Sequence, residues 1–305
     1  MSLTNFYFSD SSGKNIYVNK WVDESIVPKA VVQISHGMAE HSLRYDDFAK
    51  FLNKHGFIVY ANDHRGHGKT SPDELGYMGE GDAFNLILEN VNDLTTIIKK
   101  ENPDLPVYLL GHSMGSFISL RYSQLYGNNI DGLILSGSNG NQKFMFKIGE
   151  IIAKREMDKY GPKAKGYKME KLSFGAFNGY FKPNKTNFDW LTRDENIVNQ
   201  FIADPLCGNA HSNSYYYYLL KGLRTNHKKE NLEKIPKNLP ILIVSGEADP
   251  VGLMGKGVKR LYNSLVEIGI NSVYIKLYKN ARHEILNELN KDEVFYDILK
   301  FLNSL

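Results

Sequence analysis

A serine that could act as a nucleophile lies in residues 111–115 (GHSMG), which fit the pattern G-x-S-x-G. The apolar run 107–110, expected to form a strand, precedes Ser113, and a helical pattern over residues 114–126 follows it. This strand–turn–helix order is typical of a nucleophile elbow, in which glycines on either side leave room for a strained turn. We therefore predict that Ser113 is a nucleophile. The alternative is a tight structural turn in which the serine has no chemical role.

A base and an acid are expected further along the chain, because a serine hydroxyl needs a histidine base that a carboxylate orients. On such an elbow the chain order is serine, acid, histidine. His283 is the one histidine of nine that follows the last expected strand, residues 273–277. Asp249 and Glu247 both follow the expected strand 241–244, and Asp249 lies further beyond its end. We predict His283 as the base and Asp249 as the acid, with Glu247 as the rival.

Two backbone N–H groups are needed to bind the oxyanion of a tetrahedral intermediate. The residue after the nucleophile, Met114, is expected to supply one of them. The second should come from the loop that follows the expected strand 30–35, where Gly37 allows a close approach to the serine. We predict the N–H of Met38 as this second donor.

The elements that position these residues alternate between short strands and longer helices. Runs rich in β-branched and aromatic residues predict strands at residues 5–8, 15–20, 30–35, 57–61, 107–110, 132–135, 241–244 and 273–277. Helical patterns fall between them at residues 45–53, 83–100, 114–126, 257–268 and 291–302. This alternation predicts an α/β fold with a mostly parallel central sheet flanked by helices.

The alternation is interrupted once, between residues 135 and 241, where several helical patterns occur and no convincing strand does. Roughly 100 residues are too many for an ordinary connection. We predict an inserted helical cap over residues 139–206. Residues 1–138 and 207–305 would then form one core domain.

Composition excludes several classes of protein. The chain has 305 residues, of which 42% are hydrophobic and 23% charged, as expected for a globular protein with a core. A net charge of +3 is too small to indicate a nucleic-acid binder. No apolar run is long enough for a membrane span, and the first residues do not resemble a signal peptide. We therefore expect a cytoplasmic protein.

Neither a cofactor nor a metal is expected, because the serine mechanism requires none. The single cysteine, Cys207, cannot form an internal disulfide or a cysteine-rich zinc site. His64 and His67 have a spacing that a metal could use, but no third ligand is close in sequence, which disfavours a metal site. We expect His41, His211 and His227 at the surface or in loops.

Several motifs in order resemble those of one family: residues 36–42 (HGMAEHS), 63–68 (DHRGHG), 111–115 (GHSMG), 246–249 (GEAD) and His283. They look like the α/β-hydrolases of the monoacylglycerol lipase and lysophospholipase type, grouped with serine-aminopeptidase-like hydrolases. The resemblance runs from about residue 34 to 302. It implies the α/β-hydrolase fold, a Ser-Asp-His esterase chemistry with the roles given above, and a cap that forms an acyl-binding tunnel. Met38 departs from the small residue common there, which predicts a narrower pocket mouth.

Apolar residues in the expected cap are candidates for substrate contact. Phe144 and Ile148 belong to a helical stripe, and Phe174 and Phe177 add aromatic bulk. The alternative for the stripe is simple packing on the core. Residues 143–171 carry nine Lys or Arg against four Asp or Glu, so this part of the cap is basic. Such a surface could favour anionic substrates or transient contact with a lipid surface, although a solvated face is the more common reason.

The leading hypothesis is a serine carboxylester hydrolase that acts through an acyl-enzyme on monoacylglycerols, lysophospholipids or related acyl esters. A small-molecule ester would then be its partner, with no nucleic acid. A serine peptidase or amidase of the aminopeptidase-like branch is the alternative, although a basic cap disfavours substrates that carry an ammonium group. A non-catalytic hydrolase fold that binds a ligand is a third possibility. The sequence does not indicate an oligomeric state.

Overall fold

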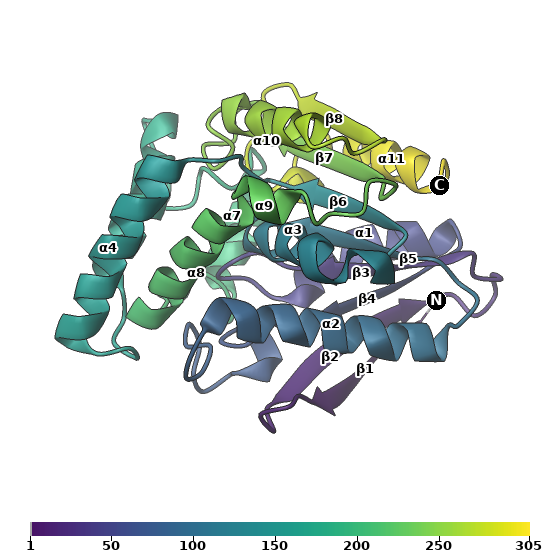
Figure 1. Ribbon diagram of the computed structural model, residues 1–305, viewed down its shortest axis with the longest axis horizontal. Helices are drawn as coiled ribbons and strands as arrows, with labels where there is room; N and C mark the ends of the chain where they lie inside the picture. Colours follow the sequence, from purple (N-terminus) through teal and green to yellow (C-terminus); the bar gives the residue numbers. More distant parts are fainter. Residues whose placement is uncertain (1) are drawn as a thin grey trace.

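A central sheet organises the chain in the computed structural model, which describes residues 2–305 (Figure 1). Its eight strands lie in the order β1-β2-β4-β3-β5-β6-β7-β8. The strands are β1 (Ser2–Ser9), β2 (Asn15–Val22), β3 (Ala30–Ser35), β4 (Phe57–Asn62), β5 (Val107–His112), β6 (Gly132–Ser136), β7 (Ile241–Gly246) and β8 (Val273–Tyr278). β1 and β2 pair antiparallel with their neighbours, and all later pairs are parallel. The predicted α/β fold with a mostly parallel sheet is confirmed, and each predicted strand is present.

Helices cover both faces of the sheet, as parallel strands require. Their bounds are α1 (Asp46–Lys54), α2 (Ala83–Glu101), α3 (Met114–Tyr126), α10 (Lys256–Glu267) and α11 (Lys291–Leu302). Apolar residues of α2, α3 and α10 share one buried cluster, whereas those of α1 and α11 share another on the opposite face. Alternate residues of each buried strand enter the two clusters: in β5, Leu109 joins the first and Leu110 the second.

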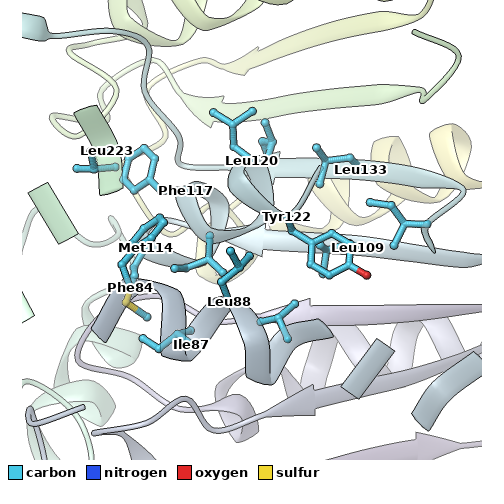
Figure 2. Packing of buried hydrophobic residues seen from close by; sticks show 14 of the residues in the cluster. Phe84, Ile87, Leu88, Leu109, Met114, Phe117, Leu120, Tyr122, Leu133 and Leu223 are labelled. Carbon is cyan, nitrogen blue, oxygen red and sulfur yellow. The ribbon is translucent and has the colours of Figure 1, made fainter. Parts of the chain in front are cut away.

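The first cluster surrounds the turn between β5 and α3 (Figure 2). Leu109 of β5 lies among side chains of α2 and α3, including Leu88 and Leu120. Met114, the first residue of α3, packs in the same cluster close to Phe84 and Phe117. Because interiors are close-packed, this cluster fixes the strand and the helix on either side of the predicted nucleophile.

A long excursion separates β6 from β7. It contains α4 (Lys143–Tyr160), α5 (Tyr167–Glu170), α6 (Ala176–Asn178), α7 (Glu195–Ala203), α8 (Asn213–Asn226) and α9 (Lys229–Leu232). Helices α4 and α8 lie side by side beyond one end of the sheet (Figure 1). The division into a core of residues 1–138 and 207–305 and a cap of residues 139–206 stays a prediction. The pairing of α8 with α4 ties part of the predicted core to the predicted cap.

The helices within residues 2–305 include none with the length and apolar character that a membrane span needs. Helix α4 has 18 residues, and charged side chains such as Lys147, Glu150 and Lys154 alternate with its apolar residues. It is therefore an amphipathic surface helix.

Candidate active site

Ser113 occupies a strained turn between β5 and α3. Its backbone has a φ of +52° and a ψ of −117°, a conformation that L-residues rarely adopt. The flanking glycines are needed here, because a Cβ on Gly115 would overlap the carbonyl of Ser35, and a Cβ on Gly111 would overlap the carbonyl of Gly115. The N–H of Ser113 donates to the carbonyl of Ser136 on β6, at 2.8 Å. This is the geometry of a nucleophile elbow, with the serine at the carboxyl end of β5.

Asp249 and His283 form a buried pair. Nδ1 of His283 lies 3.0 Å from Oδ1 of Asp249, and both residues are at most 2% exposed. Asp249 follows β7, and its carboxylate also accepts hydrogen bonds from the N–H of Val251 (2.9 Å) and the hydroxyl of Ser245 (3.0 Å). The rival acid, Glu247, is exposed and its backbone N–H bonds to Tyr278. Of the two candidate acids, the structure brings Asp249 to the histidine.

The two members of this pair shift each other's pKa. Burial alone would raise the pKa of Asp249, but the charge of His283 and the hydrogen bonds from His283, Val251 and Ser245 lower it overall. Burial would lower the pKa of His283, but the charge and hydrogen bond of Asp249 raise it above its usual value. Asp249 is therefore held as a carboxylate, and His283 is held ready to accept a proton.

The ring of His283 is fixed from both sides. Its centroid lies 4.8 Å from that of His112 and 5.0 Å from that of Trp190, which belongs to the excursion between β6 and β7. The backbone N–H groups of His283 and Glu284 donate to the carbonyls of Trp190 (3.4 Å) and Leu191 (2.7 Å). The inserted segment therefore helps to hold the loop that carries His283.

The loop after β3 is held in shape by a buried ion network. Glu40 accepts a hydrogen bond from the N–H of Gly37 (2.6 Å) and another from the hydroxyl of Tyr45 (2.8 Å). Arg44 donates to Glu40 at 2.8 Å and to both oxygens of Glu284 at 2.6 and 2.7 Å. Burial would raise the pKa of Glu40, but Arg44 and nearby histidines lower it to about 2. The network joins the loop that carries Met38 to the loop that carries His283.

A cavity of about 430 Å³ opens above these groups. Ser113, Met38, Met114 and His283 all contribute to its wall. The predicted substrate residues Ile148, Phe174 and Phe177 also line it. Phe144 does not: its side chain is 77% exposed and lies outside the lining, whereas the next two residues of α4 face the cavity. Ile148, on the same predicted stripe, does line the cavity, so the prediction fails only at Phe144, in the first turn of α4.

Other lining residues were not identified from the sequence. They include Trp190 and three leucines of α8, Leu219, Leu220 and Leu223. The leucines lie on one face of an amphipathic helix, a pattern visible in the sequence, but packing on the sheet explains such a face equally well. Trp190 lies in a segment without periodicity, where no sequence signal places a side chain against His283.

His41, His211 and His227 lie in loops, as one form of the prediction had it, but none of the three is at the surface. His41, His211 and His227 are at most 7% exposed. Nε2 of His211 lies 3.0 Å from Nε2 of His67, and Nε2 of His64 lies 3.0 Å from Oγ of Ser35. Packing between the excursion and the β4 turn covers rings that the sequence alone gave no reason to bury.

Comparison with known proteins extends over nearly the whole chain. The family described as "Serine aminopeptidase, S33" matches residues 27–290. A "Monoacylglycerol lipase" of Mycolicibacterium smegmatis is 26% identical over 297 residues, which cover 97% of this chain and 96% of the relative. A "Monoglyceride lipase" of Homo sapiens is 25% identical and covers 95% of this chain and 87% of its own length.

A solved structure shares the complete architecture. The thermostable carboxyl esterase from Bacillus coagulans, solved in complex with glycerol, superimposes with a TM-score of 0.92 at 31% identity. The alignment covers 100% of this chain and 99% of the esterase. The likeness therefore includes the excursion between β6 and β7 as well as the sheet.

Proposed function

Because the chain belongs to the serine aminopeptidase S33 family of α/β-hydrolases, we propose that this hydrolytic enzyme is a serine carboxylester hydrolase. One observation carries the proposal. A buried Asp249–His283 pair and an elbow serine meet at the wall of one cavity, at the carboxyl ends of β5 and β7. These groups fill the roles of acid, base and nucleophile in a Ser-His-Asp triad.

The proposed reaction has two halves. Oγ of Ser113 attacks the ester carbonyl while Nε2 of His283 takes the hydroxyl proton, and Asp249 stabilises the imidazolium through Nδ1. The backbone N–H groups of Met38 and Met114 stabilise the oxyanion. His283 then gives its proton to the leaving alcohol, which leaves an acyl-enzyme on Ser113. Water, deprotonated by His283, attacks this ester, and collapse of the second oxyanion releases the carboxylic acid and restores the serine.

The cavity supports an acyl ester as the substrate. Aromatic and aliphatic side chains, Phe174, Phe177 and Ile148 among them, form most of its wall, which suits an acyl chain. The relatives named monoacylglycerol and monoglyceride lipases support monoacylglycerols, with lysophospholipids and related acyl esters as neighbouring candidates. A peptide with a free ammonium group would need an unpaired carboxylate. The two glutamates that line the cavity, Glu40 and Glu284, are already bound to Arg44.

Contact with a lipid surface is part of the proposal. Phe144 and Met145, at the start of α4, are 77% and 64% exposed, and Lys147 follows them. Such a mixture of exposed apolar and basic side chains is typical of transient binding at an anionic membrane surface. The side chain of Met145 also lines the cavity, so a lipid could pass from the surface to Ser113 along this helix.

A fluorophosphonate probe tests the proposed nucleophile. We expect the probe to label the folded protein once, at Ser113. The Ser113→Ala variant should not be labelled, and its turnover of 4-nitrophenyl esters should be about 10⁶-fold lower than that of the wild-type protein. Ser25→Ala, which alters an exposed serine in a turn, is the matched control and should label normally. Labelling that persists in Ser113→Ala, or a folded wild-type protein that does not react, would refute the assignment. A panel of esters from C2 to C16, compared with aminoacyl anilides, then separates esterase from peptidase activity.

A further inference from the structure

Three side chains with metal-ligating atoms meet where the segment after α7 lies against the loop after β3. Nε2 of His41 lies 2.8 Å from Oδ2 of Asp204. These two atoms and Sγ of Cys207 all lie within 4.8 Å of one another. No other group of three His, Cys, Asp or Glu side chains within residues 2–305 is arranged in this way. The proposed ester hydrolysis uses none of the three.

The surroundings of this cluster carry an excess of negative charge. The carboxylate of Asp204 lies within the cluster, and Glu40 directly precedes His41 in the chain. Arg44 lies three residues after His41 in the chain. Its guanidinium is already bound to Glu40 and Glu284, so Asp204 is the carboxylate left facing Cys207 and His41. A cation placed between these side chains would meet a favourable field.

We propose that His41, Asp204 and Cys207 bind one Zn²⁺ ion. One imidazole nitrogen, one carboxylate oxygen and one thiolate are ligands that Zn²⁺ accepts, and three protein ligands leave a fourth position for water. Mg²⁺ and Ca²⁺ do not fit, because they require oxygen ligands. The side chain of Asp204 is 31% exposed, which gives the ion and its water access from solvent. The thiol must lose its proton when the Zn–S bond forms, so uptake of one ion releases one proton to the buffer.

The proposed site is mechanically linked to the loop that carries Met38. His41 belongs to this loop, and the N–H of Gly208, next to Cys207, donates to the carbonyl of Ala39 at 2.8 Å. In a tetrahedral site with bonds of about 2.0–2.1 Å, two ligand atoms lie about 3.3 Å apart. His41 and Asp204 must therefore separate by about half an ångström from their present 2.8 Å. Because the oxyanion donors tolerate little displacement, we infer that Zn²⁺ slows ester hydrolysis, an effect that rests on the proposed function.

Calorimetric titration with ZnCl₂ tests binding without reference to catalysis. We expect one site per wild-type chain. Loss of a hydrogen-bond partner of a metal ligand already lowers metal affinity by up to about a hundredfold, so loss of the ligand itself in Cys207→Ser should lower the Zn²⁺ affinity by more than about a hundredfold. Asp204→Asn, at a partly exposed position, should weaken binding while keeping the fold, which circular dichroism verifies. His55→Ala is the matched control, because His55 bonds to the carbonyl of Phe51 outside this cluster. Addition of Co²⁺ should produce a thiolate-to-metal absorption band that Cys207→Ser lacks.

Two results would overturn the site: no saturable Zn²⁺ binding by the wild-type protein, or equal binding by the wild-type protein and folded Cys207→Ser. The link to the loop has its own test. Zn²⁺ should lower the rate of 4-nitrophenyl acetate hydrolysis, a chelator should restore it, and Cys207→Ser should lose this sensitivity. Equal inhibition of Cys207→Ser would assign the effect to another ligand such as His283 and refute the link. Because calorimetry needs no substrate, failure of the proposed hydrolysis would be seen separately.

Discussion

Replacing Asp249 by asparagine should remove the charge that supports His283 while keeping the hydrogen bonds. Oδ1 of Asp249 accepts from both His283 and the N–H of Val251, whereas Oδ2 meets the hydroxyl of Ser245. If the NH₂ group of the asparagine replaced Oδ1, it would face the N–H of Val251, and two donors would meet. The amide oxygen must therefore take the place of Oδ1, and the NH₂ group that of Oδ2. The hydroxyl of Ser245 can rotate to accept from the amide. His283 therefore keeps its Nδ1 proton, and the variant isolates the effect of the charge.

The size of that effect follows from Coulomb's law. Two unit charges about 4 Å apart at an effective dielectric constant of about 20 attract by about 4 kcal/mol. An attraction of this size corresponds to about a thousandfold in rate. Because the dipole of the asparagine amide still provides part of the attraction to the imidazolium, we expect kcat to fall by about a hundredfold to a thousandfold. Asp249 raises the pKa of His283. Asp249→Asn should therefore also move the acid limb of the kcat/KM profile to lower pH.

Hydrolysis of 4-nitrophenyl butyrate between pH 4 and 9 measures both quantities. Glu247→Gln is the matched control, since Glu247 lies beside the same strand end but is exposed, and its rate and profile should match the wild-type enzyme. A fall of less than tenfold in folded Asp249→Asn, or an acid limb that stays in place, would refute the assignment of Asp249. A fall well beyond 10⁴-fold would refute the argument that the histidine keeps its tautomer.

Three further predictions concern stability and the surface. Gly115→Ala should destabilise the fold by about 2–4 kcal/mol in urea unfolding, because its Cβ would overlap a carbonyl of β3; a wild-type midpoint would contradict the elbow geometry. Burial lowers the pKa of His211 to about 3 and that of His227 to about 4, so below pH 6.5 the unfolded chain binds protons that the folded chain does not. Stability should then fall by about 1.4 kcal/mol per pH unit for each such histidine, and unfolding midpoints that stay constant between pH 7 and 5 would contradict this. Phe144→Ser should reduce sedimentation with anionic vesicles and leave hydrolysis of 4-nitrophenyl acetate unchanged; unaltered sedimentation would argue against lipid contact at α4.

The arrangement of the candidate site was largely predictable because topology constrains it. Ser113, Asp249 and His283 each follow a strand of a parallel sheet, and such strands bring their carboxyl ends to one edge. Residues far apart in sequence are thereby placed together by strand order alone. The choice of Asp249 over Glu247 needed only the number of residues beyond the strand end. The catalytic roles of all three await the experiments above.

The cavity wall was predictable only in part, because helix packing has no comparable rule. The stripe on α4 was identified and Ile148 lines the cavity as predicted, but at the start of the helix Met145 and Phe146 line it instead of Phe144. Sequence periodicity does not show where the first turn of a helix lies relative to a cavity, because helix boundaries are uncertain by one or two residues. The burial of His211 likewise depends on contacts with His67, 144 residues away in the chain.

The hydrogen bonds from His283 and Glu284 to Trp190 and Leu191 limit how the inserted segment can be remodelled. If the whole inserted segment moved away as one rigid body, these bonds would break. Trp190 would then no longer pack against the ring of His283. Any movement of the inserted segment that keeps these bonds leaves residues 190–191 in place. For the same reason, a chimera that exchanges the insertion between related hydrolases should keep residues 190–191 from the protein that supplies the core. These two residues support the His283 loop and cannot be exchanged with the rest of the insertion.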